Sequence, residues 1–241
     1  MDLVVFGANG PTGRLVVEQA LTVGHHVTAV TRRQPDQYPL TAPRLDVVVA
    51  DVTDRNGVER TLAGAGAVIS TFGAPYSRTE ITVYSRGIEN ITRAMAAHSV
   101  ERLVCVSSTT VATEEQPGES VFWRRGVIPL LRNTVGRTLY DDMQRMEEIV
   151  KRSGLNWTVV RPAGLFNAVG PTEDYEVATR RLPGKYTSRA DLADLLVREA
   201  IAPQHPRSII EVITRSGGPP RRWGTFLKEV MPGRGEQPVR E

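Results

Sequence analysis

The sequence predicts an α/β fold with a single doubly wound parallel sheet and helices on both faces. Three observations lead to this prediction. Apolar, β-branched runs alternate with helical periodicity over most of the 241 residues, a glycine-rich turn joins the first run to a helix, and no repeat of solenoid length is present. Strands separated by helices pair in parallel and are covered on both faces. The strand–helix units are too few for a closed eight-fold barrel.

The first quarter of the chain predicts three strands and one helix. Residues 3–7 form an apolar run typical of a buried strand. Residues 12–23 have helical periodicity, and Gly24 stands where a helix C-terminus favours glycine. Residues 26–31 and 45–50 are short β-branched runs of strand type.

The next segments continue the alternation. Asp54 can cap a short helix over residues 55–63, and the run at 67–71 predicts a strand. Between residues 81 and 95, apolar side chains spaced three and four apart form one stripe of a long helix. Residues 102–107 predict the next strand.

The C-terminal half repeats the pattern after an interruption. Residues 137–153 predict an amphipathic helix and residues 156–161 a strand. Ser188, with Asp191 three residues later, resembles a capping box that opens a helix ending near Ala200. The run at 208–214 predicts the last strand.

These elements define one domain over residues 1–214. Residues 109–136 break the alternation and predict an excursion over the site, in which the segment 122–125 offers aromatic and cationic side chains to a planar anion or anchors the excursion to the domain. Residues 215–241 form a basic tail rich in glycine and proline, which we expect to be loosely held.

The composition is that of an ordinary globular protein. A net charge of +3 is too small to indicate nucleic acid, and no apolar stretch approaches the ~20 residues that span a bilayer. The single cysteine, Cys105, fits a reducing compartment, and the histidines show no metal-ligand spacing with it. Because the first predicted strand starts at Leu3, we expect neither a signal peptide nor a transit peptide. We therefore expect a cytoplasmic protein without a metal, a nucleic-acid partner or a membrane association.

The strongest motif is the stretch VVFGANGPTGRLVVEQAL, in which glycines are spaced G-x-x-G-x-x-G between a strand and a helix. In a Rossmann unit such glycines permit a tight turn, close approach to a pyrophosphate and close packing of helix on strand, while the helix N-terminus attracts the anion. A glycine-rich connection without a ligand is the alternative. The residues expected at the phosphates are Gly7, Asn9, Gly10, Pro11, Thr12 and Gly13.

The end of the second strand indicates which dinucleotide is bound. NAD-preferring enzymes place a carboxylate there, on the ribose hydroxyls. This chain has Arg32 and Arg33 after Thr31, and its next carboxylate is Asp36. A guanidinium binds a 2′-phosphate that a carboxylate would repel. We expect NADP, with NADPH preferred over NADH, although two arginines on a solvated loop are the alternative.

The chain resembles the atypical short-chain dehydrogenase/reductase-like proteins with an NAD(P)-binding domain, near the flavin reductase/biliverdin reductase B and NmrA-like families. The resemblance rests on VVFGANGPTGRLV, ADV at 50–52, SRGIENI at 85–91, VCVSS at 104–108 and SGLNWTVVRPAGL at 153–165. It covers residues 2–214 and is specific for the superfamily, not for a substrate. It implies that Asp51 and Val52 contact the adenine, that Phe72 and Gly73 contact the cofactor ribose, and that Ser107, Ser108 and Pro162 border the nicotinamide.

The catalytic Tyr-x-x-x-Lys dyad of typical superfamily members is missing. Tyr140 lies near the corresponding helix, but Gln144 follows it four residues later, and a neutral amide cannot lower the pKa of a phenol. The resemblance aligns Ser108 with a serine proposed to assist reduction in the flavin and biliverdin reductase group. Ser108 can orient a ligand or a water, or it can simply cap backbone. The adjacent Asp141 and Asp142 are expected on a solvated helix start.

These observations favour an NADPH-dependent reductase that transfers a hydride to a flavin, quinone or related conjugated acceptor. Such acceptors need no strong protein acid, because solvent can protonate the product. The alternative is an NmrA-like module that binds NADP(H) and senses redox state without catalysis. A sugar epimerase normally needs the missing dyad. We expect a planar small molecule as partner and a monomer or a small homo-oligomer.

Overall fold

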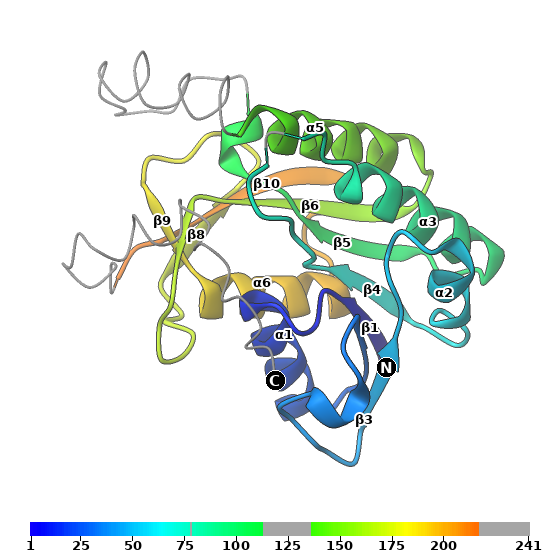
Figure 1. Cartoon of the computed structure of the whole chain (residues 1–241). Coiled ribbons are helices and arrows are strands. Elements are labelled where there is room, and N and C mark those ends of the chain that lie inside the picture. Colours follow the sequence, from blue (N-terminus) through cyan, green and yellow to red (C-terminus); the bar gives the residue numbers. More distant parts are fainter. Residues whose placement is uncertain (78, 113–135, 217–241) are drawn as a thin grey trace, which may run out of the picture.

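In the computed structural model, which describes residues 1–77, 79–112 and 136–216, the strands form an eight-stranded sheet and a two-stranded sheet. Figure 1 shows the large sheet between two layers of helices. Its order is β3 (Leu45–Val49), β2 (His26–Thr31), β1 (Asp2–Phe6), β4 (Ala67–Ser70), β5 (Arg102–Val106), β6 (Asn156–Pro162), β10 (Ser208–Thr214) and β8 (Tyr175–Ala178). Neighbouring strands are parallel except β8, which is antiparallel to β10. The chain order reverses between β1 and β4, where open α/β sheets bind their ligands.

The sheet separates two hydrophobic cores. Helices α2 (Arg55–Arg60), α3 (Val83–Ala97) and α5 (Arg137–Arg152) cover one face, and α1 (Pro11–Thr22) and α6 (Arg189–Ile201) cover the other (Figure 1). Alternate strand residues enter opposite cores: Val4 and Phe6 pack on the α3 side, whereas Leu3 and Val5 pack on the α1 side. This burial on both faces explains why the parallel strands are continuous apolar runs. The doubly wound α/β prediction is confirmed.

The predicted strands and helices lie within a few residues of the observed ones, but three short strands were missed. β7 (Gly164–Phe166) and β9 (Tyr186–Ser188) form the two-stranded sheet, and β8 adds an antiparallel edge to a sheet predicted to be wholly parallel. Strands of three or four residues are too short to show an alternation in the sequence. Two 3₁₀ turns complete the described elements, η1 (Pro35–Gln37) and η2 (Thr109–Val111). Most of the predicted excursion, including 122–125, and the tail from 217 onward lie outside the described residues.

The prediction that Asp141 and Asp142 are both solvated is wrong for Asp142. Its side chain is fully buried and accepts hydrogen bonds from the backbone N–H groups of Tyr84, at 2.9 Å, and Ser85, at 3.3 Å. The N-cap residue of α3, Thr82, makes no side-chain cap. A carboxylate of α5 therefore caps α3, because first-turn N–H groups lack helical partners and attract negative charge.

Of the two hydrogen bonds of the capping box predicted at the start of α6, the structure contains one. Ser188 accepts from the N–H groups of Ala190 and Asp191, both at 3.1 Å, as an N-cap should. The reciprocal half of the capping box is not formed. Asp191 instead accepts from the Thr172 N–H at 2.6 Å and from the Thr214 hydroxyl at 2.6 Å, so its carboxylate ties the helix to β10 and to the preceding loop.

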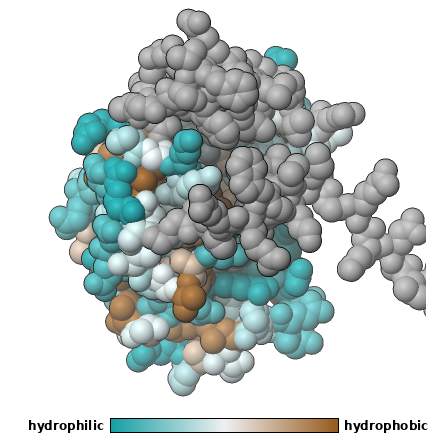
Figure 2. All heavy atoms as spheres, turned by 90° about the vertical axis from the view of Figure 1, so that its left-hand side faces the viewer, coloured by the Kyte–Doolittle hydropathy of each residue, from teal (hydrophilic) through white to brown (hydrophobic). Residues whose placement is uncertain are grey.

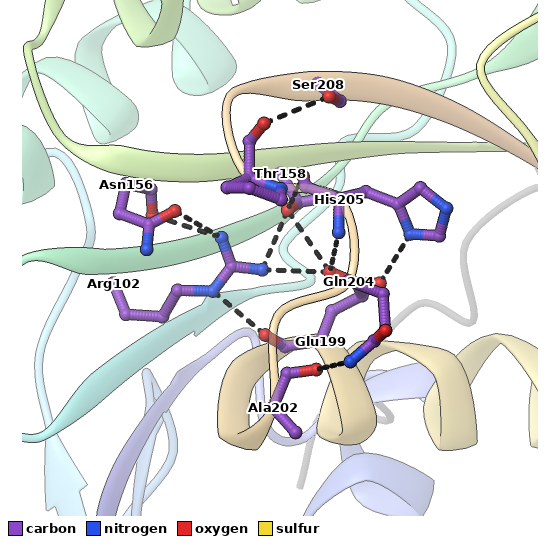
Figure 3. Close-up of polar contacts among 9 residues, drawn as sticks. Arg102, Asn156, Thr158, Glu199, Ala202, Gln204, His205 and Ser208 are labelled. Atoms are coloured by element: carbon purple, nitrogen blue, oxygen red, sulfur yellow. Dashed lines mark hydrogen bonds and ion pairs between the residues drawn. The ribbon is translucent and has the colours of Figure 1, made fainter.

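A buried polar cluster joins the amino end of β5 to α6 (Figure 3). The Arg102 guanidinium, from the first residue of β5, donates to the Thr158 hydroxyl at 2.7 Å and to the Glu199 carboxylate at 3.2 Å. Glu199 also contacts His205 Nδ1 at 2.7 Å. This cluster lies at the amino ends of the parallel strands, whereas open α/β sheets bind their ligands at the carboxyl ends. The guanidinium and the carboxylate are paired with each other and bonded to further polar groups, which is the usual condition for burying charge.

The face on the side of β8 and β9 mixes polar and apolar residues. Figure 2 shows hydrophobic side chains there as separate spots between hydrophilic ones, among the residues drawn in colour. Within the described parts of the chain, no helix combines the length and apolar character needed to cross a membrane.

Candidate functional site

The three glycines form the turn from β1 into α1. Gly7 has a φ of +77°, a conformation that residues with a Cβ rarely adopt. The Gly10 N–H donates to the Gly7 carbonyl at 2.9 Å, which closes the turn. Gly10 is the N-cap of α1, Pro11 is its first helical residue, and no acidic side chain lies in the first turn. Among the described residues, no side chain caps the positive end of α1, which is the type of site that binds an anion.

The glycines are needed for different reasons. A Cβ at Gly7 would lie 2.4 Å from the Phe72 backbone nitrogen, and one at Gly13 would lie 2.2 Å from the Gly7 carbonyl oxygen. Among the described residues, a Cβ at Gly10 would meet that carbonyl alone, at a tight 3.2 Å. Packing within the described chain thus requires Gly7 and Gly13 more strictly than Gly10. A bare backbone at a helix N-terminus fits a pyrophosphate.

Two side chains hold this loop in place. Arg14 donates from Nε and Nη2 to the Asn9 side-chain oxygen, at 3.1 and 2.7 Å. The Tyr38 hydroxyl donates to the Ala8 carbonyl at 3.2 Å, and burial raises the pKa of Tyr38 to about 12. The Asn9 side chain, which was predicted to contact the cofactor, thus has an internal role in fixing the loop.

The two arginines that suggested NADP follow β2 and are both exposed. The Arg33 N–H donates to the Thr31 hydroxyl at 3.1 Å. Asp51, after the neighbouring strand β3, accepts from the Thr53 hydroxyl at 2.7 Å and its N–H at 2.8 Å. These hydrogen bonds, aided by the charge of Arg32, lower the pKa of Asp51. The structure thus brings Arg32 and Asp51 together at the ends of two adjacent strands.

Helix α3 supports the residues predicted at the adenine and ribose. A Cβ at Gly87 would lie 2.8 Å from a Val52 methyl carbon and 2.9 Å from the edge of the Phe72 ring. The Asn90 side chain donates to the Val52 carbonyl at 3.0 Å. A Cβ at Gly73 would reach the Tyr84 hydroxyl at 3.5 Å. The loops after β3 and β4 therefore rest on one helix, and the motif residues Gly87 and Asn90 provide the space and the hydrogen bond.

Two adjacent serines follow β5, and each has a fixed partner. The Ser107 hydroxyl donates to Glu147 Oε1 at 2.6 Å, and the Ser107 N–H donates to the Val160 carbonyl at 2.8 Å. The Ser108 hydroxyl accepts from the Thr110 N–H at 3.2 Å and so caps η2. The backbone-capping alternative for Ser108 is thus observed. Pro162 is buried at the end of β6, the strand next to β5.

Among the described residues, the hydrogen-bond partner of the Tyr140 hydroxyl is another phenol. The Tyr140 hydroxyl lies 2.8 Å from the Tyr76 hydroxyl, on the loop after β4. Burial, and then the neighbouring Tyr140, raise the pKa of Tyr76. Gln144 occupies the position of the lysine in the missing dyad. Within the described residues, no group of three or more His, Cys, Asp or Glu side chains could hold a metal ion.

Sequence reasoning missed several residues that shape the site, namely Arg14, Tyr38, Glu147 and Arg161. All four contact other residues of the chain, Arg161 by donating to Glu147 at 2.7 Å. Arg14 and Arg161 lie within the quoted motifs, but at positions to which the resemblance assigns no ligand contact. Glu147 could have been noticed as a charged residue on the inward stripe of its predicted helix, since it lies four residues after Met143 and beside Met146.

A mostly parallel sheet with a glycine-rich turn and a helix N-terminus at its switch point, and with exposed arginines after the neighbouring strand β2, defines a dinucleotide-binding domain of the Rossmann type. The chain belongs to a family described as NAD(P)H-binding, whose match covers residues 7–203. An uncharacterized chloroplastic protein of Arabidopsis thaliana is 30% identical over 234 residues, covering 94% of this chain and 81% of that protein.

Solved structures share the fold. A candidate NADH-flavin reductase of Streptococcus pneumoniae superposes with a TM-score of 0.69 at 24% identity, over 89% of this chain and all of that one (100%). A short-chain dehydrogenase/reductase of Veillonella parvula in complex with NADP has a TM-score of 0.72 at 19% identity, over 89% of this chain and 95% of that one. At these identities the similarity establishes the fold.

Proposed function

We propose that this protein is an NADPH-dependent reductase that transfers a hydride to a flavin, quinone or related conjugated acceptor. The observation that carries the proposal is the set of polar groups at the end of β5. These are two serine hydroxyls with fixed partners. In addition, Tyr140 on α5 is bound to Tyr76 and has Gln144 in place of the lysine. Conjugated acceptors suit such a site because solvent can protonate their reduced product.

The cofactor would lie along the carboxyl edge of the sheet. The α1 N-terminus and Gly10 would hold the pyrophosphate, Arg32 the 2′-phosphate, Asp51 and Val52 the adenine, and Phe72 and Gly73 the ribose. When bound, NADPH supplies the hydride.

The protein would then contribute proximity and orientation. Holding two reactants in a near-attack geometry lowers the barrier without an acid. The Ser108 oxygen accepts from Thr110, and its proton has no acceptor among the described residues, so it could form a hydrogen bond to the acceptor molecule. Removal of one such bond costs ~0.5–1.5 kcal/mol. Ser108→Ala should therefore lower turnover about three- to twelve-fold, whereas loss of a true general acid would lower it ~10²–10⁴-fold.

Single-turnover oxidation of bound NADPH, tested against a panel of flavins and quinones, checks this function. We expect at least one acceptor to oxidise NADPH faster than it does without the protein, and Tyr140→Phe to matter less than Ser108→Ala. If no acceptor of the panel oxidises NADPH faster with the protein than without it, while NADPH and NADP still bind, the redox-sensing alternative is favoured. That alternative is supported by the lack of a strong acid among the described residues of the site. A thousand-fold loss in Ser108→Ala would contradict the proximity mechanism.

A further inference from the structure

Ser107, Glu147 and Arg161 form a buried triad that joins β5, α5 and β6. Arg161 donates from Nε to Glu147 Oε1 at 2.9 Å and from Nη2 to Oε2 at 2.7 Å, and Ser107 donates to Oε1 at 2.6 Å. The Glu147 side chain is 2% exposed and that of Arg161 13%. The two-point ion pair fixes the plane of the carboxylate, and hence the position of its oxygen beside Ser107.

This arrangement decides the direction of the hydrogen bond at Ser107. A serine hydroxyl has one proton and two lone pairs, whereas a carboxylate only accepts. The Ser107 proton is therefore committed to Glu147, and within residues 1–77, 79–112 and 136–216 no group donates to its oxygen, which can act as an acceptor. Ser108 has the opposite polarity, because its oxygen accepts from Thr110 and its proton has no acceptor within the same part of the chain. Two adjacent residues at the end of β5 thus provide one acceptor and one donor.

We propose that Glu147, held by Arg161, is a positioning residue that presents the Ser107 oxygen as the hydrogen-bond acceptor for the carboxamide N–H of the nicotinamide. The proposal rests on the NADP(H) site proposed above. The carboxamide fixes which way the nicotinamide ring faces, so an acceptor at this position would select the orientation of the ring. Ser107 is buried, and its N–H is bonded to Val160, so its oxygen is held in a defined place.

A cofactor analogue without that N–H tests the proposal. In 3-acetylpyridine adenine dinucleotide phosphate, a methyl ketone replaces the carboxamide, so the carbonyl is kept and the N–H donor is lost. We expect the parent protein to bind NADP about three- to twelve-fold more tightly than the analogue, the range for one neutral hydrogen bond. Ser107→Ala should bring the two dissociation constants together by weakening NADP alone.

Ser107→Ala should preserve the fold, because the buried Glu147 Oε1 keeps its hydrogen bond from Arg161. Ser108→Ala is the matched control and should leave the ratio of the two constants as in the parent. Glu147→Gln should also lower the ratio, because an amide N–H can donate to Ser107 and free the serine proton to point elsewhere. Melting temperatures of all three variants separate this effect from lost stability.

Two results would overturn the inference. If Ser107→Ala weakens NADP and the analogue equally, or changes neither, the triad is only a structural tie. If the parent binds both ligands with equal affinity, no acceptor for the carboxamide exists. Failure of the parent protein to bind NADP at all would instead overturn the proposed function, and this inference with it.

Discussion

The carbonyl oxygen of Gly7 lies only 2.2 Å from the point where a side chain at Gly13 would begin. The residue that follows β1 and the first turn of α1 are therefore in close contact, and the nearest atom is a backbone oxygen that cannot move aside as a flexible side chain can. The middle glycine of the motif is different, since a Cβ at Gly10 would lie 3.2 Å from the same oxygen. The fold thus requires glycine at position 13, whereas at position 10 a bound ligand would require it.

This difference predicts opposite behaviour of two variants. Gly13→Ala should destabilise the protein by about 1–3 kcal/mol, as expected when a methyl group is forced into a packed contact. Gly10→Val should change the free energy of unfolding by only about 0.5 kcal/mol but abolish binding of both NADPH and NADH, because it blocks the approach to the α1 N-terminus. Denaturant titration and cofactor titration test the pair. Normal NADPH binding by a stable Gly10→Val variant would refute the pyrophosphate assignment.

Arg32 should determine the preference between cofactors. We expect NADPH to bind more tightly than NADH by ~1.5–3 kcal/mol, the range for charge-assisted hydrogen bonds, or roughly ten- to a hundred-fold. Arg32→Ala should remove most of this preference and leave NADH affinity nearly unchanged. Arg33→Ala is the matched control and should have the smaller effect, because Arg32 is the arginine whose charge acts on Asp51. Equal affinities for the two cofactors in the parent protein would rule out this role for Arg32.

The capping of α3 by Asp142 predicts a stability difference between two neighbouring aspartates. Asp142→Asn should cost about 1–3 kcal/mol, because the amide loses the negative charge at the start of α3 and replaces the oxygen that accepts from the Ser85 hydroxyl with an N–H₂ group. Asp141→Asn should cost less than about 1 kcal/mol, because the ion pair of the Asp141 side chain within the described residues, with Arg137 at 3.8 Å, is exposed. Denaturant midpoints of the two variants give the comparison. Equal losses in both would mean that the buried cap does not contribute.

Tyr38 should make the protein sensitive to alkali. Its pKa is raised to about 12 by burial, above the ordinary value of 10, so the folded state holds the phenolic proton more tightly than the unfolded state. The resulting stability is complete below pH 10 and is lost as the pH rises towards 12. Tyr38→Phe, which also loses the bond to Ala8, should be less stable at pH 9. The gap to the parent should narrow above pH 10, by up to about 1.4 kcal/mol per pH unit. A gap that stays constant with pH would contradict the assignment.

Local patterns were sufficient to predict most of the elements and the motif residues. The run at 3–7, the glycine spacing after it and the cap at Asp54 are properties of a few consecutive residues, and Asp54 does accept from the Asn56 N–H at 3.1 Å. The positions of the predicted cofactor residues at strand ends follow in the same way, because parallel strands bring their carboxyl ends to one edge.

The sequence by itself thus determined an NAD(P)H-binding α/β domain, the glycine turn and the lack of a Tyr-x-x-x-Lys dyad. Only the tertiary structure decided that Asp142 caps a helix 58 residues earlier, that Ser107 gives its proton to Glu147 40 residues later, and that β8 joins the sheet antiparallel. The physical reason is the range of the interactions. Periodicity and capping depend on neighbours along the chain, whereas burial of a carboxylate depends on partners that are adjacent only after the sheet and its helices have packed.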